Sequence, residues 1–457
     1  MASLDELADR AREQAQTTAR RIIGGPPDGE LEVWRRLAWP GAIAAAALAR
    51  YSMESLRHRR RDRDGYELTE WEGGFDEVFR PASEALIGTR AIPGNKAEVL
   101  INGDRIFPPM LEAIRSATET VHFETYVYWQ GDIAVELAEA LKERAGAGVT
   151  CRVILDAIGS AKMDPRLVLQ MREAGVHVAR FRAPKPYMSG RMTNRTHRRV
   201  LVVDGTIAFT GGVGVAEEWT GDAQDPDHWR DTHVKVEGPV VRSLQGSFAE
   251  HWLEATGEAL VGEANLPQIE PIEGGSPMSI IRSGAQTGAT SGEILYVLAL
   301  STANESIEIT SAYFAPRPPF VDAMIAAVDR GVQVRVLVPG EHTDKEFVRL
   351  AGRKVYEQLI EGGVEVYEYC PTMLHAKTMQ IDGVWGTVGT LNFDNRSIKL
   401  NDEITLSLFD REIAAKLHEE FEHDLTRSEP VTEDRWRDRP WYQRVAEAAT
   451  KPLRREL

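Results

Sequence analysis

Residues 375–403 read HAKTMQIDGVWGTVGTLNFDNRSIKLNDE, and the rest of the chain is best interpreted from this stretch. His375 and Lys377 stand two residues apart in a segment of β-like alternation, so their side chains are predicted to share one face of a strand. Asp382 follows, then a glycine turn and further small residues. A histidine with a near-neutral pKa, an ammonium group and small residues that allow close backbone approach together suit a phosphate diester.

A second, weaker copy of the pattern lies earlier in the chain. Residues 197–204 read HRRVLVVD, and the spacing from His197 to Asp204 equals the spacing from His375 to Asp382. Small residues follow each copy: Gly211 and Gly212 after the first, Gly389 and Thr390 after the second. Two histidines at matching positions of a repeat indicate function far more strongly than a lone histidine would.

The paired motifs resemble the HKD signature of the phospholipase D superfamily, and within it the likeness is closest to bacterial cardiolipin synthases of the phospholipase D type. The resemblance covers about residues 95–425 and includes the flanking segments 194–197 and 229–233. It implies an α/β fold with two pseudo-twofold-related phospholipase D-like α/β/α domains in one chain. In such enzymes one histidine attacks phosphorus and the other transfers the proton, without a metal or other cofactor.

The resemblance also assigns roles to the motif residues. It implies that His197 is the nucleophile and His375 the general acid and base, although the sequence itself does not distinguish the two. Lys377 and Arg199 would hold phosphate oxygens as charge develops, and Asn392 would add a hydrogen bond.

Acidic and small residues complete the expected site. Asp204 and Asp382 are expected to orient the opposing or neighbouring histidine and to define its tautomer. Glu124 and Glu403 are weaker candidates for the same support. The small residues are expected to lie at the substrate, and they are Gly211, Gly212, Gly389 and Thr390.

The first copy departs from the family pattern at two positions. Arg199 stands where lysine is expected, and Gly214 stands where asparagine is expected. Arginine keeps the positive charge and can bind phosphate with two hydrogen bonds, but its planar fork is bulkier and differently aimed. Either the site is active with an altered first half, or that half has drifted and the protein is weak or inactive. Retention of His197 and Asp204 favours the first alternative, an active site with an altered first half.

An internal duplication surrounds the two motifs. Strands and helices alternate from about residue 95 and recur in the same order after about residue 307, which predicts a mostly parallel sheet covered on both faces. The expected divisions are a helical N-terminal accessory region (1–90), a first domain (91–260), a linker (261–276), a second domain (277–430) and a C-terminal tail helix (431–457). Helices are expected near 3–23 and 30–56, and the basic run 57–63 is either a solvated helix end or a contact for anionic lipid.

Composition limits the partners and the location. The net charge of −16 over 457 residues argues against a dedicated nucleic-acid partner. Cys151 and Cys370 sit in apolar strand-like stretches, which predicts buried free thiols and a reducing compartment. Neither a secretory signal nor a run long enough to span a bilayer is visible. These features indicate a cytoplasmic protein, with peripheral attachment at the inner face of the cell membrane as the expected route to a phospholipid.

Three functions from different classes follow. The first is phosphatidyl transfer or hydrolysis on glycerophospholipids, most simply by a cardiolipin synthase. The second is a phosphodiesterase or nuclease on the same fold, which the acidic composition disfavours. The third is a non-catalytic, membrane-associated homologue, which Arg199 and Gly214 bring into consideration. Because one chain holds both motifs, a monomer is expected to suffice for a complete site.

Overall fold

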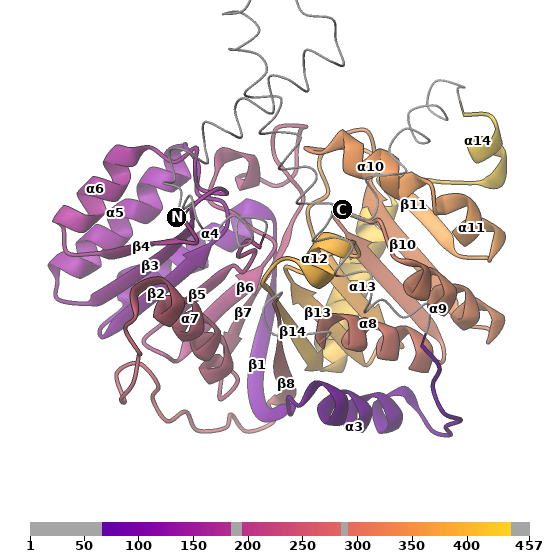
Figure 1. Ribbon diagram of the computed structural model, residues 1–457, viewed down its shortest axis with the longest axis horizontal. Helices are drawn as coiled ribbons and strands as arrows, with labels where there is room; N and C mark the ends of the chain where they lie inside the picture. Colours follow the sequence, from indigo (N-terminus) through magenta and orange to yellow (C-terminus); the bar gives the residue numbers. More distant parts are fainter. Residues whose placement is uncertain (1–65, 184–193, 285–290, 440–457) are drawn as a thin grey trace, which may run out of the picture. The chain divides into compact units, whose positions relative to one another are not determined.

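A mixed β-sheet runs through the part of the chain that the structure describes, residues 66–183, 194–284 and 291–439 of a computed structural model (Figure 1). Its strand order is β15-β11-β10-β9-β12-β13-β14-β8-β1-β7-β6-β5-β2-β3-β4. The order contains two series that repeat each other, β1 to β7 and β8 to β14, and the first strands of the two series, β1 and β8, pair with each other. The predicted α/β fold with two related halves is therefore confirmed.

The first half spans β1 to α7. Its strands are β1 (Ile92–Ile101), β2 (Thr120–Thr125), β3 (Thr150–Asp156), β4 (His177–Phe181), β5 (Val200–Val203), β6 (Ile207–Gly211) and β7 (Thr232–Glu237). Its helices are α4 (Asn102–Ser116), α5 (Asp132–Gly146), α6 (Pro165–Glu173), the 3-10 helix η2 (Glu217–Trp219) and α7 (Val241–Thr256).

The second half follows the same plan. Its strands are β8 (Ser276–Ser283), β9 (Ser306–Ser311), β10 (Gln333–Pro339), β11 (Glu365–Tyr369), β12 (Lys377–Ile381), β13 (Trp385–Gly389) and β14 (Glu403–Phe409), and β15 (Ser428–Pro430) is added beside β11. Its helices are α8 (Ser291–Thr302), α9 (Pro318–Asp329), α10 (Glu346–Arg353), α11 (Tyr356–Glu361), α12 (Asn395–Lys399), α13 (Arg411–Leu425) and α14 (Glu433–Arg437).

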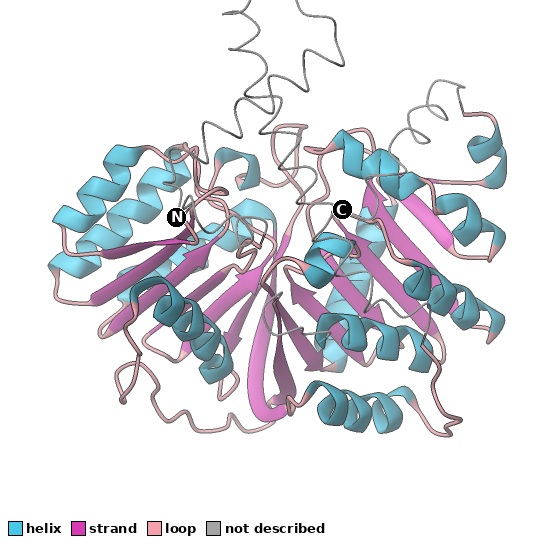
Figure 2. Cartoon of the chain, viewed as in Figure 1, coloured by secondary structure: helices cyan, strands magenta, loops and turns pink. Residues whose placement is uncertain are grey.

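Helices cover both faces of the sheet (Figure 2). In the first half α4, α5 and α6 bury their apolar residues on one face, and in the second half α8, α9 and α11 do the same. On the other face α7 and α13 share a core cluster that joins the two halves. The helix α3 (Phe75–Ile87) precedes the first half in sequence, yet its Phe79 ring packs 4.8 Å from Trp385 in the second half.

The prediction of a mostly parallel sheet is wrong. Only the pairs β2–β3, β3–β4, β9–β10 and β10–β11 are parallel among the described strands, and the remaining pairs are antiparallel. The reason lies in the motifs themselves. Each motif strand turns back at once into a hairpin, β5–β6 or β12–β13, and a hairpin pairs its strands antiparallel.

The motif aspartates build these hairpin turns. Asp204 and Gly205 both have positive φ, as do Asp382 and Gly383, which is the backbone that Asp-Gly favours in a tight hairpin. The Asp204 carboxylate accepts hydrogen bonds of 2.8–2.9 Å from residues 118–120. Asp382 does the same with the amides of residues 304–306. The prediction that these aspartates orient a histidine is therefore wrong, because their oxygens tie the hairpin to the start of the neighbouring strand.

Replacing Asp204 with asparagine is expected to lower the free energy of unfolding without changing the rate of the reaction. Burial acts to raise the pKa of Asp204, but hydrogen bonds from Thr120, Thr118 and Glu119 outweigh it and hold the pKa below its usual value. The ionised group therefore stabilises the fold above its unfolded pKa of about 3.9, and this contribution is lost as pH falls through the lower folded pKa. We expect Asp204→Asn to reduce the free energy of unfolding by about 1–2 kcal/mol, given partial solvent exposure.

Urea unfolding of the wild type and Asp204→Asn at pH 7 and at pH 3 measures this effect. Asparagine tolerates positive φ, so the turn itself is retained. The difference between the two proteins should shrink at pH 3. Equal stability at pH 7 combined with a loss of turnover would contradict the structural role.

Both cysteines are free thiols, but they differ in exposure. Cys151 on β3 is buried, as predicted, and burial raises the pKa of its thiol to about 12. Cys370 is exposed, so the prediction of a buried thiol is wrong there. It directly follows β11, where the chain leaves the sheet.

Several predictions about the chain ends fall outside the described residues. They are the helices near 3–23 and 30–56, the basic run 57–63, and the tail from residue 440 onward. Within the ranges that the structure does cover, none of the helices has the length and apolar character needed to cross a bilayer.

Candidate active site

Each motif histidine is held by the opposite half of the molecule. The backbone N–H of His197 donates to the carbonyl of Asp402 (2.8 Å), and that of His375 donates to the carbonyl of Arg230 (2.7 Å). Both histidines are buried. Each histidine lies just before its motif strand, β5 or β12. Its backbone is therefore fixed by a residue just before β14 or β7 of the other half.

A buried carboxylate from the opposite half also binds each imidazole. His197 Nδ1 lies 2.8 Å from Glu403 Oε2, and His375 Nδ1 lies 2.7 Å from Asp231 Oδ2. A carboxylate beside Nδ1 selects the tautomer in which Nδ1 carries the proton and donates it. Nε2 is then the ring nitrogen available for attack or proton transfer.

A cation stands beside each histidine and contacts both its ring and its carbonyl oxygen. Arg199 Nη1 donates to the carbonyl oxygen of His197 (3.0 Å), and its Nη2 lies 3.3 Å from Nε2 of that ring. Lys377 Nζ likewise contacts the carbonyl oxygen of His375, and it lies 2.9 Å from Nδ1 and 3.1 Å from Nε2 of that ring. Arg199 therefore reaches the place that lysine takes in the second half, and both cations are buried.

Burial and this concentration of positive charge set the protonation states. Burial lowers the pKa of both His197 and His375 well below the usual range, and the charges of Arg199 and Lys377 lower both further. Burial also lowers the pKa of Lys377 to about 7 and raises that of Glu403 to about 7. A bound phosphate diester would bring a further negative charge, which favours the protonated form of each histidine and of Lys377.

Sequence reasoning missed several residues of the site. Asp231 lies within a flanking segment, but no role was predicted for it. It directly precedes β7 just as Glu403 opens β14, and that matching position was the available signal.

Lys345, which was also missed, comes from the β10–α10 loop, outside any motif. Its Nζ lies 4.4 Å from the Tyr313 ring centroid, and its charge lowers the pKa of both motif histidines. Tyr126 packs edge-on against His197, with ring centroids 5.2 Å apart.

The predicted small residues lie at the ends of β6 and β13, the second strands of the two hairpins, beside the strands that follow the carboxylates. A Cβ atom added to Gly389 would fall 2.5 Å from the carbonyl oxygen of Ile404, and one added to Gly211 would fall 2.6 Å from His233. Thr390 donates through its hydroxyl to Glu403 Oε2 (2.5 Å). These contacts position the acidic residue, and direct contact with substrate stays a prediction.

Asn392 is buried, and both its amide oxygen and its amide nitrogen already form hydrogen bonds within the protein. Its Oδ1 accepts from the backbone N–H of Tyr313 (3.2 Å), and its Nδ2 donates to Ser397 Oγ (3.4 Å). The expected hydrogen bond to phosphate therefore stays a prediction, to be made by the second N–H of the amide.

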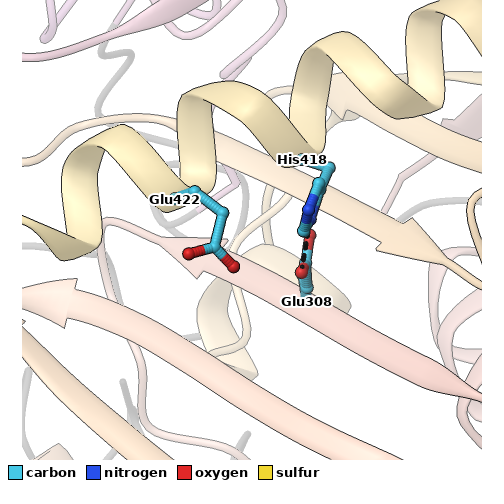
Figure 3. Close-up of side chains that lie close together, drawn as sticks. All are labelled: Glu308, His418 and Glu422. Atoms are coloured by element: carbon cyan, nitrogen blue, oxygen red, sulfur yellow. Dashed lines mark hydrogen bonds and ion pairs between the residues drawn. The ribbon is translucent and has the colours of Figure 1, made fainter.

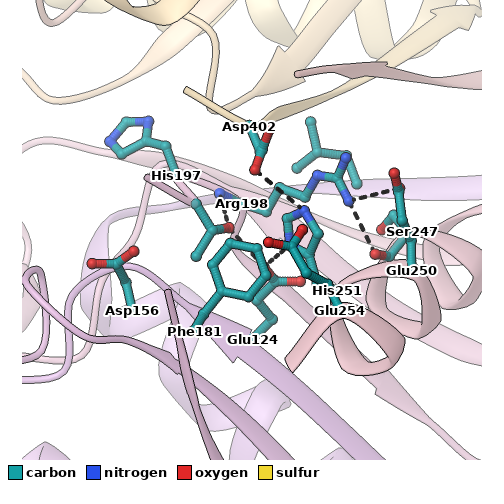
Figure 4. Close-up of polar contacts among 12 residues, drawn as sticks. Glu124, Asp156, Phe181, His197, Arg198, Ser247, Glu250, His251, Glu254 and Asp402 are labelled. Carbon is teal, nitrogen blue, oxygen red and sulfur yellow. Dashed lines mark hydrogen bonds and ion pairs between the residues drawn. The ribbon is translucent and has the colours of Figure 1, made fainter. Parts of the chain in front are cut away.

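Glu124 supports the chain next to His197 instead of the ring. It accepts from Thr196 Oγ1 and from His251 Nδ1, both at 2.6 Å, within the buried network of Figure 4. Burial raises the pKa of Glu124 to about 7 and lowers that of His251 to about 3. His251 Nε2 in turn lies 3.5 Å from Asp402 Oδ2, so the network connects the two halves directly behind the His197 backbone.

A further group of described residues has the spacing of metal ligands but does not make a convincing metal site. Glu308, His418 and Glu422 each place one ligand atom within 4.8 Å of the others (Figure 3). Arg335 forms ion pairs with both carboxylates, and Gln380 donates to Glu308 (3.0 Å). Arg335 already pairs with both carboxylates, so the group is explained as an ionic contact between α13 and the sheet.

The fold and site define a class of enzyme: one that cleaves phosphate diesters through two facing half-sites, each with a histidine, an orienting carboxylate and a cation. Comparison with known proteins agrees. Residues 110–252 and 296–425 match the family described as "Cardiolipin synthase, PLD-like domain". The chain belongs to this phospholipase D-like family of cardiolipin synthases, which confirms the resemblance drawn from the motifs.

Individual relatives cover most of the chain. It is 32% identical over 383 residues to the cardiolipin synthase of Halalkalibacterium halodurans, which is 83% of this chain and 76% of that protein. It is 33% identical over 360 residues to the cardiolipin synthase of Geobacillus sp. (strain WCH70), which is 78% of this chain and 72% of that protein. The crystal structure of phosphatidylserine synthase from Haemophilus influenzae shares the fold, with a TM-score of 0.61 at 12% identity over 83% of this chain and 100% of that one.

Proposed function

We propose that this protein is a phosphatidyltransferase of the cardiolipin synthase type, which joins two phosphatidylglycerol molecules and releases glycerol. Family membership supports the reaction class. The observation that carries the proposal is the reciprocal arrangement of two half-sites in one chain, each with a histidine, a carboxylate and a cation. A second alcohol in place of water as the acceptor is part of the proposal.

In the first step, Nε2 of one histidine attacks phosphorus and a P–N bond forms as the P–O bond to glycerol breaks. We assign attack to His197, following the family likeness. Nε2 of His375, protonated, gives its proton to the departing glycerol oxygen. Proton transfer of this kind contributes roughly 10²–10⁴-fold, and covalent catalysis divides one difficult displacement into two easier ones. Asp231 stabilises the His375 imidazolium that this step requires.

In the second step, neutral His375 takes the proton from the hydroxyl of the acceptor lipid. The acceptor oxygen attacks phosphorus, the P–N bond to His197 breaks, and the phosphodiester of the product forms. Arg199 and Lys377 are placed to neutralise the non-bridging oxygens in both steps, where charge develops. Atoms and protons balance: one glycerol leaves for each diester formed.

Because the substrate is a bilayer lipid, the reaction needs a membrane surface. We propose peripheral attachment at the inner face of the cell membrane and a monomer as the active unit. Flotation with phosphatidylglycerol vesicles and analytical ultracentrifugation test these two statements.

The function itself is tested by mass spectrometry of phosphatidylglycerol vesicles incubated with the purified protein. Cardiolipin together with glycerol is the expected result. Phosphatidic acid alone would assign a hydrolase, and cleavage of DNA without any lipid product would favour the nuclease alternative. No product from either substrate would overturn the proposal.

A further inference from the structure

The two halves support their orienting carboxylates with different side chains. Gly212 and Thr390 hold equivalent places, because their N–H groups donate to the carbonyls of Thr232 and Ile404, the residues that directly follow Asp231 and Glu403. In the second half, Thr390 donates to the carboxylate of Glu403. Glycine cannot donate through a side chain, so the first half must support its carboxylate in another way.

Trp219 is the donor in the first half. Its indole Nε1 donates to Asp231 Oδ2 (2.8 Å), the same oxygen that lies 2.7 Å from Nδ1 of His375. The indole is 2% exposed, and its ring packs edge-on against the His375 ring with centroids 5.3 Å apart. One side chain therefore contacts both the catalytic imidazole and the oxygen that orients it.

Gly214 leaves the space that this indole occupies. A Cβ atom at Gly214 would lie 2.8 Å from Cβ of Val127 and 3.2 Å from two carbons of the Trp219 ring. Gly214 is not among the glycines with positive φ, so its backbone does not require glycine. In the second half the matching residue, Asn392, faces the small side chain of Ser397. The first half thus lacks the asparagine of the family pattern because the Trp219 ring fills the space that its side chain would need.

We propose that Trp219 is a positioning residue for His375, acting through Asp231, and that Gly214 is present to admit it. In the first half, Trp219 then supports the carboxylate in place of a motif side chain, and glycine at position 214 is not a sign of lost function. This inference rests on the proposed function, because it concerns the histidine to which proton transfer is assigned.

The indole N–H should affect the pH dependence of the reaction. Burial raises the pKa of Asp231, while the charges of Lys377 and Arg199 and the hydrogen bonds from Thr232 and Trp219 lower it. Without the indole donor the carboxyl would hold its proton to higher pH, and a neutral Asp231 would stabilise the His375 imidazolium less. The acidic limb of the kcat profile should therefore move to higher pH.

The first experiment compares Trp219→Phe with a matched control, Trp252→Phe. Trp252 is also buried, and its Nε1 also donates to a carboxylate, Oε2 of Glu258 (2.8 Å), just after the end of α7. Phosphatidyl transfer by Trp219→Phe should fall about 10–100-fold in kcat, as expected for loss of a hydrogen bond to a charged group. KM should change little and the acidic limb should shift. Trp252→Phe should keep the wild-type rate and pH profile.

The second experiment restores the motif asparagine. If the first half had drifted, Gly214→Asn would raise activity. We expect it to lower kcat, because the new side chain must displace Val127 or Trp219. Adding Gly214→Asn to Trp219→Phe should then cost less than it costs in the wild type. A gain of activity in Gly214→Asn, or a wild-type rate and pH profile in Trp219→Phe, would overturn the inference.

A readout that needs no turnover separates this inference from the proposed function. In protein labelled with ¹⁵N in its imidazole rings, with His375→Ala used for assignment, Trp219→Phe should shift the Nδ1 signal and the titration of His375. An unchanged signal would refute the positioning role whatever the lipid activity. If the wild type makes no cardiolipin but Trp219→Phe still shifts the His375 signal, only the proposed reaction would be refuted.

Discussion

Alanine in place of either motif histidine is expected to abolish phosphatidyl transfer, and the two variants should fail at different steps. His197→Ala lacks the nucleophile, so kcat should fall by about 10⁴-fold or more and no phosphoenzyme should form. His375→Ala lacks the proton donor, which is worth roughly 10²–10⁴-fold when the leaving group is an alkoxide. Glycerol is such a leaving group, so both variants should be inactive on lipid.

A substrate with an acidic leaving group separates the two roles. Bis(p-nitrophenyl) phosphate releases p-nitrophenolate without help from an acid, so His375→Ala should show a burst of p-nitrophenol and accumulate phosphohistidine. His197→Ala should show neither. His177→Ala is the matched control, because His177 is an exposed residue that opens the edge strand β4, and it should behave as the wild type. A phosphoenzyme in His197→Ala and none in His375→Ala would reverse the assigned order.

Amide replacements of the two orienting carboxylates are expected to have the next largest effect. Asp231→Asn and Glu403→Gln keep the shape of each side chain but remove the negative charge that fixes Nδ1–H and stabilises the imidazolium. In a histidine-based protease the corresponding change costs about 10⁴-fold in kcat. We expect a loss of about 10³–10⁴-fold for each variant on phosphatidylglycerol.

The crossed geometry makes this prediction specific. Glu403 lies in the second half but binds His197, so Glu403→Gln should reproduce the failure to form phosphoenzyme that His197→Ala shows. Asp231→Asn should instead resemble His375→Ala. Asp204→Asn serves as the control, since it should lose stability and keep its turnover. A Glu403→Gln variant that resembles His375→Ala would contradict the assignment.

The sequence was sufficient for features that can be identified from spacing along the chain. The two motif histidines, the duplication around them and the glycine turn after Asp382 are such features, whereas the hairpin after each motif was missed. The error about Asp204 and Asp382 has the same origin, because an acidic residue at a fixed distance from a histidine suggests a partner for it. Turn geometry explains these aspartates instead, and the Asp-Gly dipeptide was the available signal.

What the sequence could not supply depends on contacts between the halves. Asp231 and His375 are far apart in the chain, and only the packing of one half on the other brings them within hydrogen-bonding distance. Lys345 stands in a loop without a motif, and its role is visible only from the charge it adds beside Tyr313. The contact between Gly214 and the Trp219 ring likewise depends on how much space the folded chain leaves beside the glycine, which the sequence does not show.

The covalent connection of the two halves has an evolutionary consequence. In a dimer of identical subunits every substitution is made twice, so the two histidines must remain equivalent and any specialisation of one is imposed on the other. Here the paired strands β1 and β8 belong to a single gene product, and the two supports have already diverged, with Trp219 on one side and Thr390 on the other. Because both halves lie in one chain, each half can change independently of the other, while the crossed contacts require that the two be retained together.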